Sequence, residues 1–318
     1  MPSALALSAA NLTSDAAVAA AKPPAPEARE ASRISVSFEF FPPKTRAMEN
    51  QLGQTIERLA VLQPAFMSVT CGAGGSTREG THQTVRRIQS ETGVRAAAHL
   101  TCAGASRTEI DQIAESYWTA GIRHLVALRG DPVHGADGVH QPGPDGYHHA
   151  DALVRGLRML RPFEISVAAY PETHAQAASA QADLDALKRK ADAGATRAIT
   201  QFFFDVDAFA RFLDKTQRAG IDIPIVPGIL PVTNFAKVAA FAKACKVGIP
   251  AGVHTQFEGI SDDPATLQGV AASIATEQCM ALRKLGVRHF HFYTLNRAEL
   301  SFAIAHLLGV RAVHAEVG

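Results

Sequence analysis

A carboxyl group placed as an acid–base catalyst would be lies in the first apolar segment of this 318-residue sequence. Segment 35–40 alternates, so that as a β-strand it would place its apolar residues on one face and Glu39 with two serines on the other, inner face. Two prolines end the segment soon after Glu39. Burial at that strand end would favour the protonated form of Glu39, as a general acid requires. The segment alone fits equally well a glutamate that pairs with a neighbouring Arg or Lys.

Polar side chains also stand at or just after the ends of six further apolar segments. They are Thr70, His99, Asp131, Tyr170, Gln201 and the pair Asn296 and Arg297. A lone histidine such as His99 is more often a buried structural residue than a functional one. Polar groups at seven strand ends are harder to attribute to core packing, and in a barrel those ends would share one rim.

A metal site is a weaker interpretation of the same polar residues. Alternation would put His289 and His291 on one strand face, where they could form a metal-binding pair. Metal-dependent barrel hydrolases combine a His pair on the first strand with further His and Asp ligands from later strands, and those partners are missing here. The four cysteines show no C-x-x-C spacing. We therefore predict no metal.

The elements that would position these side chains alternate between short β-branched or aromatic runs and longer segments with helical spacing. The predicted strands are 36–41, 66–71, 95–102, 124–130, 165–170, 198–204, 225–230 and 289–295, and helices are predicted at 47–62, 108–120, 176–193 and 265–285, among others. Eight strands with eight crossovers predict a single (β/α)8 TIM barrel, because an open doubly wound sheet usually has fewer strands. We expect residues 33–318 to form this catalytic domain and residues 1–32, rich in Ala, Pro and Ser, to be a disordered tail.

The composition narrows the class of protein further. The chain is 47% hydrophobic and 19% charged with a net charge of +1, which fits a cytoplasmic globular protein. It has neither the basic excess nor the Lys/Arg clusters of a nucleic-acid-binding surface. Its start lacks the features of a signal peptide, and no apolar run reaches the roughly 20 residues that span a membrane. We expect small-molecule substrates.

Seven segments, in order and together, resemble the methylenetetrahydrofolate reductase family in its short bacterial form. These segments are SFEFFPP (37–43), HLTC (99–102), ALRGD (127–131), AAYPE (168–172), TQFFFD (200–205), PGILP (227–231) and FYTLNR (292–297). The resemblance covers about residues 34–310. It implies an oxidoreductase of one-carbon metabolism that holds FAD non-covalently and uses NAD(P)H in a ping-pong reaction. The reaction would reduce 5,10-methylenetetrahydrofolate to 5-methyltetrahydrofolate and so feed methionine synthesis.

The resemblance also implies a role for individual residues. Glu39 would be the general acid, and Asp131 would lie beside the flavin and the pterin and tune the flavin potential. The flavin site would comprise Thr70, His99, Arg129, Gly130, Asp131, Ala150, Tyr170, His174, Asp183, Arg189 and Lys190. The folate site would comprise Glu39, Asp131, Gln201, Lys237, Phe241 and Arg297, with Gln201 also binding the nicotinamide.

Some features of this assignment stay open at the level of sequence. Lys237 stands where the family has Gln, and Ala186 where it has Asn. Phe241 could stack on a planar ligand, although an apolar helix face explains it equally well. A folate-binding lyase or methyltransferase without flavin, and a non-catalytic folate-binding barrel, are the alternative classes. We expect NADH in preference to NADPH from the bacterial character of the chain, and a homo-oligomer by analogy with relatives.

Overall fold

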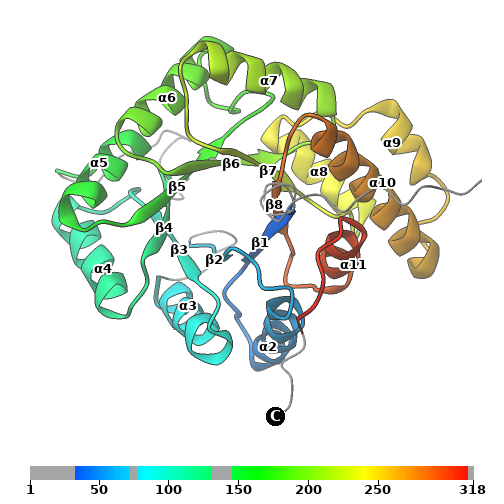
Figure 1. Ribbon diagram of the computed structural model, residues 1–318, viewed down its shortest axis with the longest axis horizontal. Helices are drawn as coiled ribbons and strands as arrows, with labels where there is room; N and C mark the ends of the chain where they lie inside the picture. The colour runs from blue at the N-terminus through cyan, green and yellow to red at the C-terminus, as the bar shows by residue number, and fades with distance from the viewer. Residues whose placement is uncertain (1–32, 72–77, 131–144, 314–318) are drawn as a thin grey trace, which may run out of the picture. The chain divides into compact units, whose positions relative to one another are not determined.

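The strands of the chain close into a parallel barrel in sequence order, as Figure 1 shows for the computed structural model, which describes residues 33–71, 78–130 and 145–313. The strands are β1 (Ser35–Phe40), β2 (Met67–Val69), β3 (Ala96–Thr101), β4 (His124–Leu128), β5 (Glu164–Ala169), β6 (Arg197–Phe202), β7 (Ile225–Ile229) and β8 (His289–Tyr293). The barrel closes where Ser35 of β1 pairs with His289 of β8. All eight predicted strands and the predicted fold class are confirmed.

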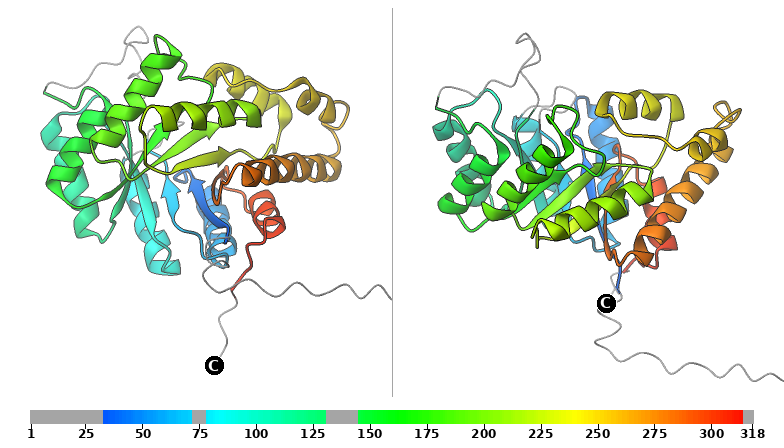
Figure 2. Two further views of the ribbon diagram at one scale, coloured as in Figure 1. Left: turned by 45° about the horizontal axis from the view of Figure 1, so that its top comes forward. Right: turned by 90° about the horizontal axis from the view of Figure 1, so that it is seen from above.

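Helices lie between consecutive strands and form the outer layer (Figure 2). They are α2 (Arg46–Ala60), α3 (Arg78–Thr92), α4 (Arg107–Thr119), α5 (Ala150–Leu160), α6 (Ala180–Asp192), α7 (Val206–Arg218), α8 (Phe235–Cys245), α9 (Ala251–Gln256), α10 (Pro264–Lys284) and α11 (Glu299–Leu307). None of these helices is long and apolar enough to cross a membrane. The tail predicted at residues 1–32 falls outside the described ranges, and the domain boundaries remain predictions.

The helix ends follow local capping chemistry. Asp263 caps α10 by accepting hydrogen bonds from the Ala265 and Thr266 amides, with Pro264 as the first helical residue, one residue before the predicted start. The start predicted for α6 at residue 176 is wrong by four residues. Ser179 accepts a hydrogen bond from the Ala182 amide, and the helix begins only after this cap.

Strand alternation divides the buried side chains into two layers. The larger layer lies between the strands and the helices and includes Phe38, Phe40 and Phe292. The smaller apolar cluster consists of Phe66, Ala97, Val126, Ile199 and Val226. Successive residues of a strand point to opposite faces, so residues of this second cluster face the inside of the barrel, together with the polar side chains of the site.

Candidate functional site

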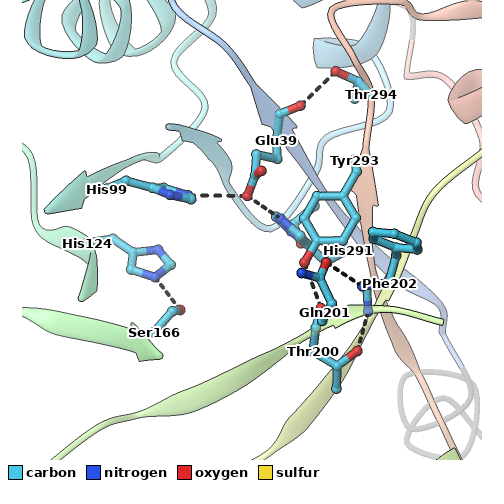
Figure 3. Close-up of polar contacts among 12 residues, drawn as sticks. Glu39, His99, His124, Ser166, Thr200, Gln201, Phe202, His291, Tyr293 and Thr294 are labelled. Carbon is cyan, nitrogen blue, oxygen red and sulfur yellow. Dashed lines mark hydrogen bonds and ion pairs between the residues drawn. The ribbon is translucent and has the colours of Figure 1, made fainter. Parts of the chain in front are cut away.

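Glu39 lies near the carboxyl end of β1, with its side chain 13% exposed and between two histidines (Figure 3). One carboxylate oxygen, Oε2, is 3.3 Å from His99 Nε2 and 3.4 Å from His291 Nε2. The predicted inner-facing position of Glu39 is therefore confirmed. The alternative that Glu39 pairs with a neighbouring Arg or Lys is wrong among the described residues, because both partners are imidazoles from other strands.

The electrostatic state of Glu39 differs from the sequence-based expectation. Burial alone would raise the pKa of Glu39, but the charge on His99 and the hydrogen bonds from His291 and His99 outweigh burial and lower that pKa from 4.5 to about 2. The raised pKa that we expected from desolvation is thus wrong for the protein without substrate. Glu39 is ionised near neutral pH, so it must gain a proton before it can donate one.

Behind Glu39, toward the amino end of the strands, lies a serine between two histidines. Ser37 Oγ is 2.8 Å from His291 Nδ1 and 2.9 Å from His289 Nε2. Burial lowers the pKa of both rings, to about 3 for His289, and the neighbouring charges add to this for His289. Both histidines are therefore neutral near pH 7.

The two histidines of β8 do not form a metal-binding pair. One nitrogen of each ring is engaged with the same serine hydroxyl. In the part of the chain that the structure describes, no three His, Cys, Asp or Glu side chains converge as a metal would require. The shared face of His289 and His291 serves hydrogen bonding instead.

Residues at the end of β8 form hydrogen bonds to β1, which carries Glu39, and to β6, which carries Gln201. Thr294 Oγ1 donates a hydrogen bond to the Glu39 carbonyl oxygen at 2.7 Å, and Tyr293 Oη donates one to the Thr200 carbonyl oxygen at 2.6 Å. A Cβ atom on Gly228 would lie 2.2 Å from that same Thr200 oxygen, so only glycine fits there. Sequence reasoning gave no role to Tyr293, although it continues the alternation of His289 and His291.

Gln201 is placed by an irregularity in the sheet. The register between β6 and β7 shifts between Ile199 and Phe202, and Gln201 lies within that shift. Its Oε1 accepts a hydrogen bond from the Phe202 amide at 3.0 Å. A bulge commonly redirects a side chain next to a functional site. Gln201 is drawn with Glu39 and Tyr293 in Figure 3, at the carboxyl end of the barrel.

The residues predicted to hold flavin are spread over four neighbouring βα units. Thr70 follows β2, His99 lies in β3, Arg129 and Gly130 follow β4, Ala150 opens α5, Tyr170 and His174 follow β5, and Asp183, Arg189 and Lys190 lie in α6. Three of them are in direct contact. The Tyr170 and His174 rings meet edge to face at 4.5 Å, and the His174 amide donates to Asp183 Oδ2 at 2.8 Å.

Several of these groups have unused capacity to bind an anionic dinucleotide. Lys190 is buried and donates to the Ala168 carbonyl oxygen, and burial lowers its pKa to about 8 despite the opposing carboxylates. A phosphate nearby would stabilise its charged form. Among the described residues, the buried Thr70 hydroxyl has no hydrogen-bond partner, and the cap residue of α5, His149, makes no side-chain capping bond. These residues fit a bound flavin nucleotide.

The remaining predicted folate residues lie on α8 and in the loop after β8. Lys237 and Phe241 are exposed on α8, and the Phe241 ring, 52% exposed, stacks on Phe202 at 5.3 Å. Phe241 is thus half-exposed while one side of it packs on the barrel, and its stacking on a planar ligand stays a prediction. Arg297 lines a cavity of about 160 Å³ that also contacts Thr294, the residue bonded to the Glu39 backbone.

Two predicted positions receive no direct support from the geometry. Asp131 lies outside the described residues, so its place beside the flavin stays a prediction. Ala186, where the family has Asn, lies within α6 and offers no polar group. The roles assigned to the flavin and folate residues likewise remain predictions, although Thr70, Arg129 and Tyr170 directly follow strands, where a barrel site is expected.

Comparisons with known proteins agree with the sequence resemblance. The model of a family described as methylenetetrahydrofolate reductase matches residues 26–309. A 5,10-methylenetetrahydrofolate reductase of Pectobacterium carotovorum is 54% identical over 280 residues, which cover 88% of this chain and 91% of that protein. The protein of the same name from Escherichia coli is 52% identical over 279 residues, covering 88% and 92%.

One plant relative and one solved structure extend the comparison. An Arabidopsis thaliana protein named methylenetetrahydrofolate reductase (NADH) 1 is 37% identical over 292 residues, covering 88% of this chain and 49% of that protein. A Clostridium thermocellum protein whose structure is described as binding two copies of 5-methyl-5,6,7,8-tetrahydrofolic acid has a TM-score of 0.58 at 15% identity, covering 89% of this chain and 96% of that one. At that identity the likeness shows a shared fold.

Proposed function

The chain belongs to the methylenetetrahydrofolate reductase family, and we propose that it reduces 5,10-methylenetetrahydrofolate to 5-methyltetrahydrofolate with FAD and a reduced nicotinamide. The observation that carries the proposal is the placement of Glu39, an inner-facing carboxylate at the barrel mouth within 3.4 Å of two imidazoles. The names of the bacterial relatives support the substrate. The name of the plant relative supports NADH.

The proposed reaction needs one proton and one hydride. Breaking the bond between the methylene carbon and one folate nitrogen leaves an electron pair on that nitrogen, which takes the proton. The methylene carbon becomes an iminium carbon and accepts the hydride, so that a methyl group results. Bound FAD supplies this hydride chemistry, with electrons that come from the nicotinamide.

Glu39 is the group that delivers the proton in this scheme. The pKa of Glu39 is low in the protein without substrate because His99 and His291 stabilise the carboxylate. A folate over the carboxylate would exclude water and favour the neutral acid. His291, whose Nε2 is 3.4 Å from the carboxylate, lies where it can pass a proton to Glu39 Oε2.

The binding roles follow from charge and shape. Lys190, Arg189 and Arg129 would meet the phosphates of FAD, since guanidinium and ammonium groups form charge-assisted bonds with phosphate oxygens. Phe241 is exposed and backed by Phe202, and so offers a flat apolar surface to a planar ligand. Arg297 and Lys237 would face the carboxylates of the folate, and the cavity beside Arg297 has room for part of it.

An absorbance spectrum before and after anaerobic addition of NADH tests this proposal. We expect purified protein to be yellow, to bleach with NADH and to regain its colour when methylenetetrahydrofolate is added. A colourless protein that binds folate would favour a lyase or methyltransferase without flavin. A protein that binds folate and flavin but never oxidises NADH with an added acceptor would instead be a binding barrel.

A further inference from the structure

The proposed reaction requires one folate molecule to meet two groups at once, and this inference rests on that proposed function. Glu39 protonates a ring nitrogen of the folate, while Arg297 faces the carboxylates at the other end of the same molecule. We propose that Asn296 is a positioning residue whose side-chain amide fixes the distance between Glu39 and Arg297. Its role does not depend on contact with the substrate.

The Asn296 side chain binds both backbone groups of a single residue at the end of another strand. The Phe41 amide donates to Asn296 Oδ1 at 2.8 Å, and Asn296 Nδ2 donates to the Phe41 carbonyl oxygen at 2.9 Å. We call these two hydrogen bonds the Asn296 clamp. Because β1 ends at Phe40 and β8 at Tyr293, the clamp continues the pairing of these two strands beyond their ends. The side-chain amide here takes the place of a backbone peptide.

The turn that carries Asn296 has a conformation that residues with a Cβ atom seldom adopt. Leu295 and Asn296 have φ angles of 51° and 56°, in the left-handed region. The Asn296 amide donates to Thr294 Oγ1 at 3.1 Å. Its carbonyl oxygen accepts from Thr55 Oγ1 at 3.1 Å and from Gln51 Nε2 at 3.3 Å. With the clamp, all four polar groups of this buried residue are hydrogen-bonded, and such conformations persist only where the surroundings hold them.

The clamp joins the two residues that the proposed reaction uses. Phe41 lies two positions after Glu39, and Arg297 directly follows Asn296. Thr294 Oγ1 also donates to the Glu39 carbonyl oxygen at 2.7 Å (Figure 3), and the Arg297 amide donates to the Thr294 carbonyl oxygen at 3.0 Å. The backbones at Glu39 and Arg297 are therefore connected by a short series of hydrogen bonds. A folate that is held by Arg297 meets Glu39 at a fixed distance.

A fixed distance matters because alignment governs the rate of the chemical step. A displacement of about 1 Å between reacting groups can lower a rate roughly a hundred-fold. Binding energy from remote parts of a substrate can serve to align its reacting centre. Without the clamp, Arg297 still binds the carboxylates of the folate, but the ring nitrogen is no longer held against Glu39. Loss of the clamp should therefore lower the limiting rate of the folate step and leave affinity for folate almost unchanged.

The opposite end of the barrel offers a matched control. Thr196, which precedes β6, binds both backbone groups of Ile165 in the neighbouring strand β5. Its hydroxyl accepts from the Ile165 amide at 3.0 Å and donates to the Ile165 carbonyl oxygen at 2.9 Å. One side chain thus joins two strands here as well, but at their amino ends and away from Glu39. Thr196→Val removes both bonds and keeps the shape of the side chain.

Anaerobic rapid mixing of the FAD-loaded protein measures the effect of the clamp. Asn296→Gly removes both bonds and accepts the left-handed backbone. For this variant we expect the limiting rate of re-oxidation by methylenetetrahydrofolate to fall at least about ten-fold, with the half-saturating concentration within about three-fold. Flavin reduction by NADH should stay within about two-fold, because it needs no proton from Glu39. Thr196→Val should leave both steps within about two-fold.

A second variant keeps the test valid if glycine unfolds the protein. Asn296→Asp preserves size and still accepts from the Phe41 amide, but it cannot donate to the Phe41 carbonyl oxygen while it is ionised. We expect the limiting rate of re-oxidation to fall at least about five-fold in this variant. As the pH falls and the carboxyl group gains a proton, it can donate again, so its rate relative to the parental protein should rise.

A double-mutant cycle with Arg297 supplies a readout that a purely structural role would not move. Arg297→Ala removes the anchor for the folate carboxylates, so no anchored end remains for the clamp to align. In that background Asn296→Gly should slow re-oxidation by no more than about two-fold further. In the Thr196→Val background it should keep its full effect. An equal loss with and without Arg297 would reduce Asn296 to a structural residue and overturn the proposal.

The parental protein separates failure of this inference from failure of the proposed function. If methylenetetrahydrofolate re-oxidises the parental flavin but both Asn296 variants react at the parental rate, the proposed function stands and the positioning role is wrong. A higher half-saturating concentration with an unchanged limiting rate, or equal slowing of both half-reactions, would also contradict that role. If the parental flavin is not re-oxidised by methylenetetrahydrofolate, the proposed function is wrong and this inference fails with it.

Discussion

The inside of the barrel and the layer between strands and helices are built from the same strands but hold opposite kinds of residue. Phe38 of β1 is fully buried against the helices, while its neighbour Glu39 faces two histidines on the inside. The outer layer is continuous and apolar, and the inner apolar cluster has only five buried members among the described residues. Strand alternation thus separates stability from chemistry within single strands.

The two layers also differ in how completely their groups are satisfied. Burying a large apolar side chain contributes about 1.5–3 kcal/mol, and the outer layer contains many. In the part of the chain that the structure describes, the inside contains polar atoms that are buried without a hydrogen-bond partner, including Ser68 Oγ and His124 Nδ1. Such groups disfavour folding unless water or a ligand satisfies them. The comparison predicts that substitutions outside act on stability and substitutions inside act on proton transfer.

The largest effect expected from this comparison is a loss of stability in the outer layer. Phe209 of α7 is fully buried and stacks on Phe203 at 5.0 Å. Phe209→Ala should lower the free energy of unfolding by about 3–5 kcal/mol, because it leaves a cavity. Urea denaturation measures this change. A similar loss of unfolding free energy in Glu39→Gln would contradict the expectation that substitutions inside the barrel act on proton transfer and not on stability.

A smaller effect is the pH dependence of stability that the histidines inside the barrel should cause. Burial, with nearby charges, lowers the pKa of His124, His289 and His291 below 6.5 in the folded state. Below pH 6.5 the unfolded chain binds protons that the folded chain does not, so stability falls as the pH falls. Each such histidine adds about 1.4 kcal/mol per pH unit to the slope. The depressed pKa of Glu39 adds to the loss below pH 4.5.

Urea denaturation at a series of pH values checks this slope. His124→Gln should remove the contribution of one histidine to the slope of unfolding free energy with pH and leave the contribution of the other two. A free energy of unfolding that is constant between pH 6.5 and 4.5 would show that the interior histidines are protonated in the folded protein, contrary to the account.

A still smaller effect is expected where the two layers meet at the barrel mouth. Tyr293→Phe removes the hydrogen bond to the Thr200 carbonyl oxygen, which is 2.6 Å long. We expect a loss of about 0.5–1.5 kcal/mol in the free energy of unfolding, as for a single hydrogen bond. Calorimetry of the variant measures it. No change would mean that water replaces the phenol.

The smallest effect is predicted for the N-terminal segment. Residues 1–32 show no periodic apolar pattern in the sequence. Their deletion should leave flavin content and activity within about two-fold. Flavin absorbance and NADH oxidation of the shortened protein are the measurements. Loss of soluble protein would show instead that the segment contributes to stability.

The outer layer could be predicted from the sequence far better than the inside. Alternation in segment 35–40 placed Glu39 on the correct face, and all eight strands were recognisable because apolar periodicity is a local signal. The partners of Glu39 were not recognisable, because His291 is 252 residues away and only barrel closure brings it near. The direction of the Glu39 pKa shift was wrong for the same reason, since it depends on those partners.

The most direct test of the account compares the two half-reactions of Glu39→Gln with those of the parental protein by anaerobic rapid mixing. The substitution keeps size and hydrogen bonding but removes the proton, and only the folate step needs that proton. We predict that flavin reduction by NADH changes less than about ten-fold and that re-oxidation by methylenetetrahydrofolate slows at least about a hundred-fold. Equal slowing of both steps, or of neither, would contradict the assignment of Glu39 as the proton donor.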